Sequence, residues 1–104
     1  MLLVDADLRR PKVDQYMGVE GGAGLTDLLI GRAELQDVVQ KWGRGQLYVL
    51  PAGRIPPNTS ELLGSAAMVR LLEEFSSAFD VILFDAPPLL PVTTLDRFTR
   101  VYWS

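Results

Sequence analysis

The sequence predicts an α/β domain built on a parallel β-sheet with flanking helices. Three short apolar runs read as strands, at residues 2–5, 47–50 and 81–85. The first and third are apolar at nearly every position before a closing aspartate, which is typical of parallel strands covered on both faces. Stretches with helical spacing separate the runs, and this alternation predicts right-handed strand–helix–strand crossovers.

Four stretches carry the helix signals. Residues 24–30 predict a short helix that ends at Gly31, since glycine favours the position after a helix. A second short helix is predicted at residues 33–40, and residues 58–61 (NTSE) resemble a capping box. Residues 65–79 predict the longest helix, because their apolar positions include the 3–4 spacing of a buried stripe.

Composition limits the chemistry that the chain can perform. Its 104 residues fit one domain. The absence of histidine and cysteine excludes Ser-His-Asp catalysis, thiolate metal sites and disulfides. A net charge of −3 gives no electrostatic reason to expect nucleic acid as a partner. No apolar run reaches the ~20 residues that span a bilayer, so we expect a cytoplasmic location, with membrane association only through a partner or a further segment.

Three carboxylates follow the predicted strands. Asp5 and Asp7 lie two residues apart after the first run, and Asp85 ends the third. Because parallel strands end at one edge of a sheet, we expect these acids to converge there. A hard cation such as Mg²⁺, together with phosphate oxygens, would relieve their mutual repulsion. The alternative is that the first two acids lie in water, paired with Arg9 and Arg10.

The order of the motifs along the chain resembles that of the bacterial tyrosine kinases, or BY-kinases. Residues 2–11 (LLVDADLRRP) are similar to the Walker A′ motif of that family, and residues 81–85 to its Walker B strand. Between these two motifs lie three further similar segments in the family's order, residues 24–29 (GLTDLL), 50–53 (LPAG) and 56–63 (PPNTSELL). The similarity at the Walker B strand extends through residues 81–88 (VILFDAPP). Five ordered segments covering roughly residues 1–93 are a much stronger signal than any one of them.

The resemblance implies a partial P-loop NTPase-like fold, with residues 1–104 forming a single partial BY-kinase-like domain. It implies an ATP-dependent protein-tyrosine kinase that regulates capsular and exopolysaccharide biosynthesis and export, with Mg²⁺ and ATP as cofactors. The implied partner is a polysaccharide copolymerase membrane protein or domain, at the inner face of the cell membrane. A homo-oligomer is also expected.

The same resemblance assigns roles to individual residues. Asp5 would be the base that accepts the tyrosine proton, and Asp7 would support the Mg²⁺ network. Asp85 would hold the metal as the Walker B acid. Arg9 matches the arginine of the motif, and it would be a cofactor-binding residue that positions the Walker A′ loop.

One departure from the family concerns the phosphate loop. A G-x-x-x-x-G-K-[ST] sequence is absent, because Lys12 follows proline and Lys41 follows glutamine. This loop, which precedes Walker A′ in the family, supplies the amides and lysine that hold the phosphates. We therefore expect that the 104 residues alone do not bind Mg·ATP, and that the apolar strands lack a neighbour and expose an edge that can pair with other chains.

Two alternatives remain open at this point. The first is a partition- or septum-positioning ATPase of the deviant Walker group, which shares the strand–aspartate signals. The second is a non-catalytic remnant or interaction module that docks on an intact kinase.

Overall fold

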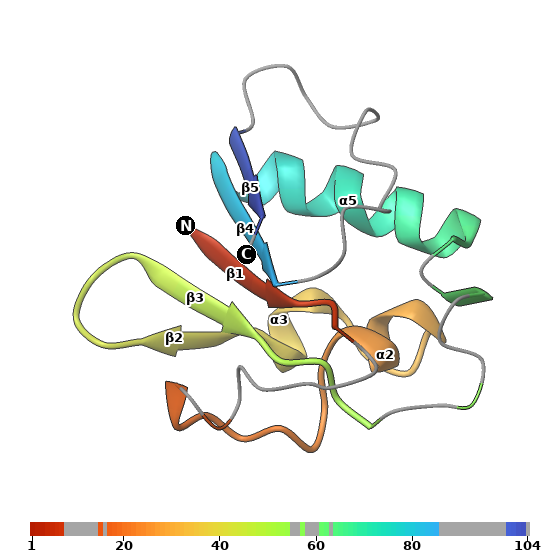
Figure 1. Cartoon of the computed structure of the whole chain (residues 1–104), viewed down its shortest axis with the longest axis horizontal. Helices are drawn as coiled ribbons and strands as arrows, with labels where there is room; N and C mark the ends of the chain where they lie inside the picture. Colours follow the sequence, from red (N-terminus) through yellow and green to blue (C-terminus); the bar gives the residue numbers. More distant parts are fainter. Residues whose placement is uncertain are drawn as a thin grey trace.

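The computed structural model describes residues 1–7, 15, 17–54, 57, 61–62 and 64–85, and the backbone of strand residues 100–103. Within them lies a five-stranded sheet with the order β2-β3-β1-β4-β5 (Figure 1). The strands are β1 (Leu2–Asp5), β2 (Gln40–Trp42), β3 (Leu47–Leu50), β4 (Val81–Asp85) and β5 (Arg100–Trp103). The helices are α2 (Leu25–Leu29), α3 (Leu35–Val38) and α5 (Ala66–Ala78).

The sheet is mainly parallel, as the sequence predicts. β1 pairs in parallel with β3 and β4, β4 pairs in parallel with β5, and only β2 runs antiparallel to its neighbour β3. The three predicted strands have their predicted bounds. The expectation that these strands lack a neighbour is wrong, because β1, β3 and β4 are each paired on both sides.

The predicted helix at residues 33–40 is shorter than expected. It is helical only at Leu35–Val38, and Gln40 begins β2. Valine and tryptophan residues favour extended backbone, and pairing with β3 outweighs the helical spacing that continues through Gln40. Neither β2 nor β5 is predicted from the sequence.

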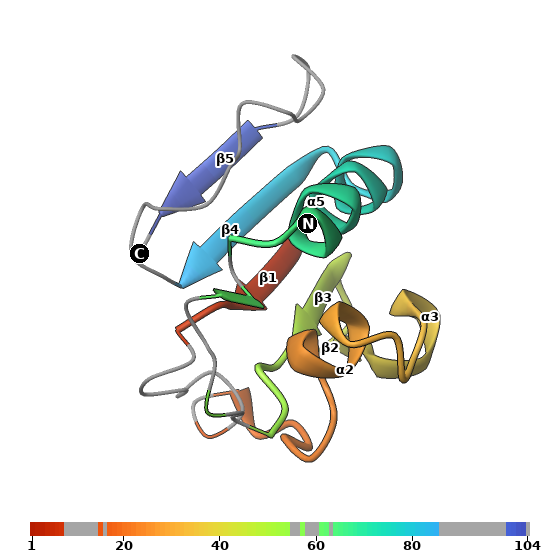
Figure 2. The same ribbon diagram turned by 90° about the vertical axis from the view of Figure 1, so that its right-hand side faces the viewer.

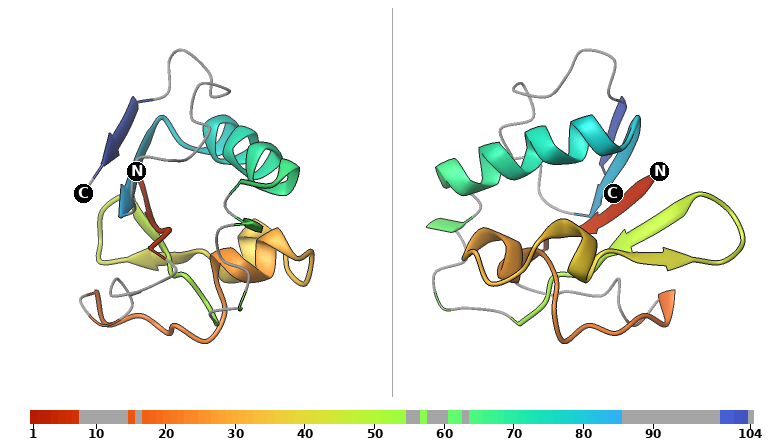
Figure 3. Two further views of the ribbon diagram at one scale, coloured as in Figure 1. Left: turned by 45° about the vertical axis from the view of Figure 1, so that its right-hand side comes forward. Right: turned by 180° about the vertical axis from the view of Figure 1, so that it is seen from behind.

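The described helices all lie on one face of the sheet (Figures 2 and 3). Alternate strand residues point toward them and are fully buried: Leu2, Val4, Ile82 and Phe84. On the opposite face, Leu3, Val81 and Leu83 are half-buried. We call these three residues the second face, and among the described helices none covers it.

Helix α5 forms most of the core on the helical face. Ser65 caps its first turn, where the side-chain hydroxyl accepts a hydrogen bond from the Met68 N–H at 3.3 Å. Its buried residues are Met68, Leu71, Leu72 and Phe75, so Met68 extends the predicted stripe. The helix closes at Phe79, whose ring packs at 5.6 Å from that of Tyr48. Most of the predicted capping box at residues 58–61 lies outside the described residues.

The outer edge of β2 is covered by residues 17–20. The Gln40 side-chain amide donates to the Glu20 carbonyl at 2.8 Å and accepts from the Glu20 N–H at 3.3 Å. The Trp42 indole N–H donates to the Met17 carbonyl at 2.7 Å. Side chains of β2 therefore attach the backbone of residues 17 and 20 beside this strand.

Candidate functional site

The candidate site lies at the carboxyl edge of β1 and β4. The parallel register of these strands aligns Asp5 with Asp85, and the Ala6 N–H extends the pairing by donating to the Asp85 carbonyl at 3.1 Å. Adjacent strands lie about 4.8 Å apart, so the two aspartates are neighbours across the sheet. The fold thus brings together two acids that are 80 residues apart in the sequence.

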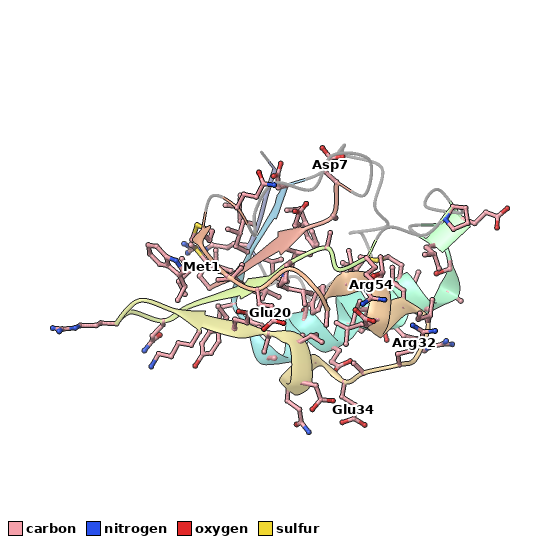
Figure 4. All side chains as sticks on the ribbon, turned by 90° about the horizontal axis from the view of Figure 1, so that it is seen from below. Met1, Asp7, Glu20, Arg32, Glu34 and Arg54 are labelled. Carbon is pink, nitrogen blue, oxygen red and sulfur yellow. The ribbon has the colours of Figure 1, made fainter. Side chains whose placement is uncertain are left out.

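The turn after β1 fixes the conformation of Asp5. The Asp7 N–H donates to Asp5 Oδ1 at 3.2 Å. Asp5 is 0% exposed, whereas Asp7 and Asp85 are half-buried. Figure 4 shows Asp7 at the far end of β1 with its carboxylate directed outward. Of the three predicted acids, Asp7 and Asp85 are therefore the two that are partly exposed to solvent.

The acids at this edge offer the oxygen ligands that Mg²⁺ prefers. No group of three or more acidic side chains arranged to hold a metal ion occurs among the described residues. Mg²⁺ is usually bound through one or two carboxylates, with the remaining ligands supplied by water and substrate phosphates. The oxygen donors at this edge fit that ligand class, and the nucleotide would have to complete the coordination.

The fourth predicted site residue, Arg9, lies outside the described residues. Its part in binding the cofactor and positioning the Walker A′ loop stays a prediction.

Two of the motifs meet at a joint beside this edge, a contact that the sequence reasoning missed. The Leu25 N–H donates to the Pro51 carbonyl at 2.8 Å, and the Thr26 N–H donates to the Ala52 carbonyl at 3.0 Å. The Gly24 N–H donates to Asp27 Oδ2 at 2.8 Å. The start of α2 is thereby bound to the chain leaving β3, and we call this contact the α2–β3 joint.

Glycine makes the α2–β3 joint possible. A Cβ at Gly24 would overlap the Pro51 carbonyl oxygen and would lie 2.8 Å from the Gly53 nitrogen. Gly53 has a φ of +81°, a left-handed conformation that favours glycine. The sequence does carry a signal of this close backbone approach, because each of the two motifs, residues 24–29 and 50–53, contains a glycine. Because Leu50 is the register partner of Val4, the joint lies at the same edge as Asp5.

Known proteins match most of this chain in sequence. No family model matches the chain. It is 42% identical over 92 residues to the tyrosine-protein kinase YwqD of Bacillus subtilis (strain 168), which covers 88% of this chain and 39% of the relative. The tyrosine-protein kinase etk of Escherichia coli (strain K12) is 40% identical over 93 residues, covering 89% of this chain and 13% of the relative. The chain thus spans well under half the length of these relatives.

Solved structures agree in fold. The chimerical protein CapA2B2 superimposes with a TM-score of 0.81 at 32% identity, covering 98% of this chain and 47% of that one. The kinase domain of the Escherichia coli tyrosine kinase ETK superimposes with a TM-score of 0.77 at 40% identity. The match covers 89% of this chain and 36% of that one. The septum site-determining protein MinD of Pyrococcus horikoshii, solved with Mg-ADP, superimposes with a TM-score of 0.65 at 26% identity. The match covers 89% of this chain and 38% of that one.

Proposed function

This chain belongs, in sequence and fold, to the bacterial tyrosine kinases, of which it spans one segment, and we propose that it supplies the acidic edge of their catalytic site. The observation that carries the proposal is the alignment of Asp5 with Asp85 at the carboxyl ends of adjacent parallel strands. Ligands of open α/β sheets bind at such ends. The reaction would transfer the γ-phosphoryl group of ATP to a tyrosine hydroxyl.

Each acid has a part in that reaction. Asp7 and Asp85, which are half-buried, would hold Mg²⁺ through carboxylate oxygens. When bound, the ion neutralises phosphate charge. Asp5 would accept the proton of the tyrosine hydroxyl. Because Asp5 is 0% exposed here, that role requires the edge to rearrange before a substrate hydroxyl can contact the carboxylate.

The phosphates need a loop that the 104 residues do not contain. Backbone amides and a lysine normally bind them, through charge-assisted hydrogen bonds roughly twice as strong as neutral ones. We therefore expect no measurable Mg·ATP binding by the chain alone. Binding is expected once a G-x-x-x-x-G-K-[ST] phosphate loop is supplied, a loop that by the family resemblance precedes the Walker A′ segment.

Isothermal titration calorimetry of Mg·ATP into the chain, alone and mixed with a polypeptide segment that carries such a phosphate loop, tests the proposal. The mixture should bind ATP only when Mg²⁺ is present and should phosphorylate a tyrosine-containing peptide. Asp85→Asn should abolish the Mg²⁺ dependence. Asp5→Asn should slow phosphorylation on the order of 10²–10⁴-fold, the usual contribution of a general base.

Asp80→Asn is the matched control, because exposed Asp80 precedes β4 at the opposite edge of the sheet. It should change neither binding nor rate. An ATP isotherm with the chain alone would contradict the requirement for an external loop. Equal effects of Asp80→Asn and Asp85→Asn would contradict the assignment of the edge.

The biological setting follows from the family resemblance. The chain would act in capsule or exopolysaccharide production with a polysaccharide copolymerase at the inner membrane face, and would self-associate there. No described helix has the length and apolar character needed to cross a bilayer. Affinity capture from cells tests this setting. Recovery of a copolymerase or full-length kinase supports it, and recovery of neither contradicts it.

The septum-positioning ATPase alternative is less well supported. The fold similarity to MinD, with a TM-score of 0.65 at 26% identity, is lower than that to the ETK kinase domain. The segments at residues 2–11 and 56–63 also favour the kinases.

A further inference from the structure

An open groove runs between α5 and the end of α2, on the side of the helices that faces away from the sheet. The two elements pack side by side there (Figure 3). The groove is lined by apolar residues and by two charged residues of α5: Leu28, Ile30, Ala67, Leu71, Arg70 and Glu74. Ile30 is 50% exposed although its side chain is large and apolar, and Arg70 and Glu74 are exposed. Apolar surface thus lies next to a pair of opposite charges, a combination that suits contact with another protein.

The order of the charges along α5 determines which partner fits this groove. Arg70 and Glu74 lie one helical turn apart, about 6 Å along the helix axis and about 40° around it. A second copy of α5, placed antiparallel about a two-fold axis midway between them, brings each Arg70 opposite the Glu74 of the other copy. A parallel copy would place like charges opposite each other. The outer side of α5 is therefore complementary to itself in the antiparallel orientation.

The same axis pairs the remaining outer residues of α5 without a clash. Residues at equal distances on either side of the axis lie opposite each other, so Ala67 faces Ser77 and Ala66 faces Ala78. These side chains are small, which lets the two helix axes approach to about 8 Å. Glu73 is turned about 80° away from the two-fold axis and lies at the margin of the contact.

We propose that the outer side of α5 is a surface through which two copies of this chain associate, antiparallel and about a two-fold axis. The dimer forms two Arg70–Glu74 ion pairs, and each copy covers the groove and Ile30 of the other. α5 has 13 residues and is about 20 Å long, so the contact buries less than the roughly 1,200–2,000 Å² of stable complexes. The dimer is therefore weak. This surface goes beyond the proposed function, because it lies away from the acidic edge.

Charge reversal tests the antiparallel pairing. Arg70→Glu leaves two acids on the outer side of α5, and Glu74→Arg leaves two bases, so either change places like charges opposite each other in a dimer. Sedimentation velocity of the chain, at concentrations up to about 1 mM, should show a monomer–dimer equilibrium that each single reversal weakens on the order of tenfold or more. An equimolar mixture of the two variants should associate at least as strongly as the unmodified chain, because the acids of one variant face the bases of the other.

The mixture separates pairing between chains from an effect within one chain. Both variants lose the attraction between Arg70 and Glu74 of the same helix, and mixing does not restore it. The double variant Arg70→Glu with Glu74→Arg has opposite charges again and should regain most of the lost affinity. Arg44→Glu is the matched control, because it makes the same change in net charge at an exposed residue between β2 and β3. It should leave the dimer nearly unchanged.

Ile30→Ser tests the apolar part of the contact. It should weaken the dimer about fivefold, because the partner no longer covers an apolar side chain, and the circular dichroism of the chain should stay unchanged. A chain that remains monomeric to about 1 mM would overturn the inference. Single reversals that leave the dimer intact, or a mixture that associates no better than either variant alone, would also overturn it.

These measurements need no nucleotide, so the two proposals fail separately. Absence of Mg·ATP binding in the presence of a phosphate loop contradicts the proposed function and leaves the α5 surface standing. Absence of the dimer refutes the α5 surface and leaves the acidic edge standing.

Discussion

Replacement of Gly24 by alanine tests the α2–β3 joint. Gly24 is buried and has a φ of 178°, an extended conformation that any residue adopts. The cost of Gly24→Ala is therefore steric. The new methyl group would overlap the Pro51 carbonyl oxygen, and would lie 2.6 Å from the Pro51 carbonyl carbon and 2.8 Å from the Gly53 nitrogen. These are backbone atoms, so no side chain can rotate away.

The expected loss of stability can be worked out from the bonds that the methyl group separates. Relief of the overlap must lengthen the bonds from Leu25 N–H to Pro51 and from Thr26 N–H to Ala52. Each such bond contributes about 1 kcal/mol, and a buried group left without a partner costs about 1–3 kcal/mol. Alanine restricts the unfolded chain and returns about 0.4–1 kcal/mol. The net loss in the free energy of unfolding should be about 2 kcal/mol or more, which lowers the Tm by roughly 8–16 °C.

Urea and thermal unfolding followed by circular dichroism measure this loss. Gly22→Ala is the matched control, because a Cβ there meets only the Glu20 side chain, at 3.8 Å. It should change the free energy of unfolding by less than about 0.5 kcal/mol. If Gly24→Ala and Gly22→Ala melt at the same temperature, the joint does not contribute to stability and the reasoning is refuted.

Other stability predictions concern helix ends and the core. Ser65→Ala removes the cap that accepts from Met68 N–H and should cost about 1 kcal/mol, whereas Ser77→Ala, at an exposed hydroxyl, should cost less than about 0.5 kcal/mol in the same urea titration. Met68→Ala should cost about 2–5 kcal/mol because the side chain is fully buried; an Arg70→Ala control that loses as much would contradict this. Asp27→Ala removes the acceptor of the Gly24 N–H and should lower the Tm by several degrees. An unchanged Tm would contradict a stabilising role for that hydrogen bond.

The elements that could be predicted are those whose sequence pattern lies within the element itself. β1, β3 and β4 have continuous apolar runs, and α5 has both a cap and a stripe, so their sequences alone specify them. β2 could not be predicted, because its three residues become a strand only through pairing with β3 and through the bond from Gln40 to Glu20. β5 likewise depends on an edge of β4 that the sequence does not reveal.

The predictability of the site differed between its parts. Placement of Asp5 beside Asp85 follows from the topology of a parallel sheet, which strand–helix alternation already implies. Complete burial of Asp5 does not follow, because it depends on the conformation of the turn that brings the Asp7 N–H to Asp5 Oδ1. The α2–β3 joint involves residues about 26 positions apart, whose approach is set by tertiary packing.

The contact between residues 17–20 and the side chains of β2 bears on how copies of this chain could pair through their sheet edges. Growth of a fibre from sheets requires that strands can add at both outer edges of every molecule. Residues 17–20 bind the side chains of β2 at one edge, whereas at the other edge β5 is the outermost described strand. Two molecules joined through β5 about a two-fold axis would occupy the β5 edge of both. Among the described strands, such a pair leaves only the β2 edges, beside residues 17–20, for further pairing.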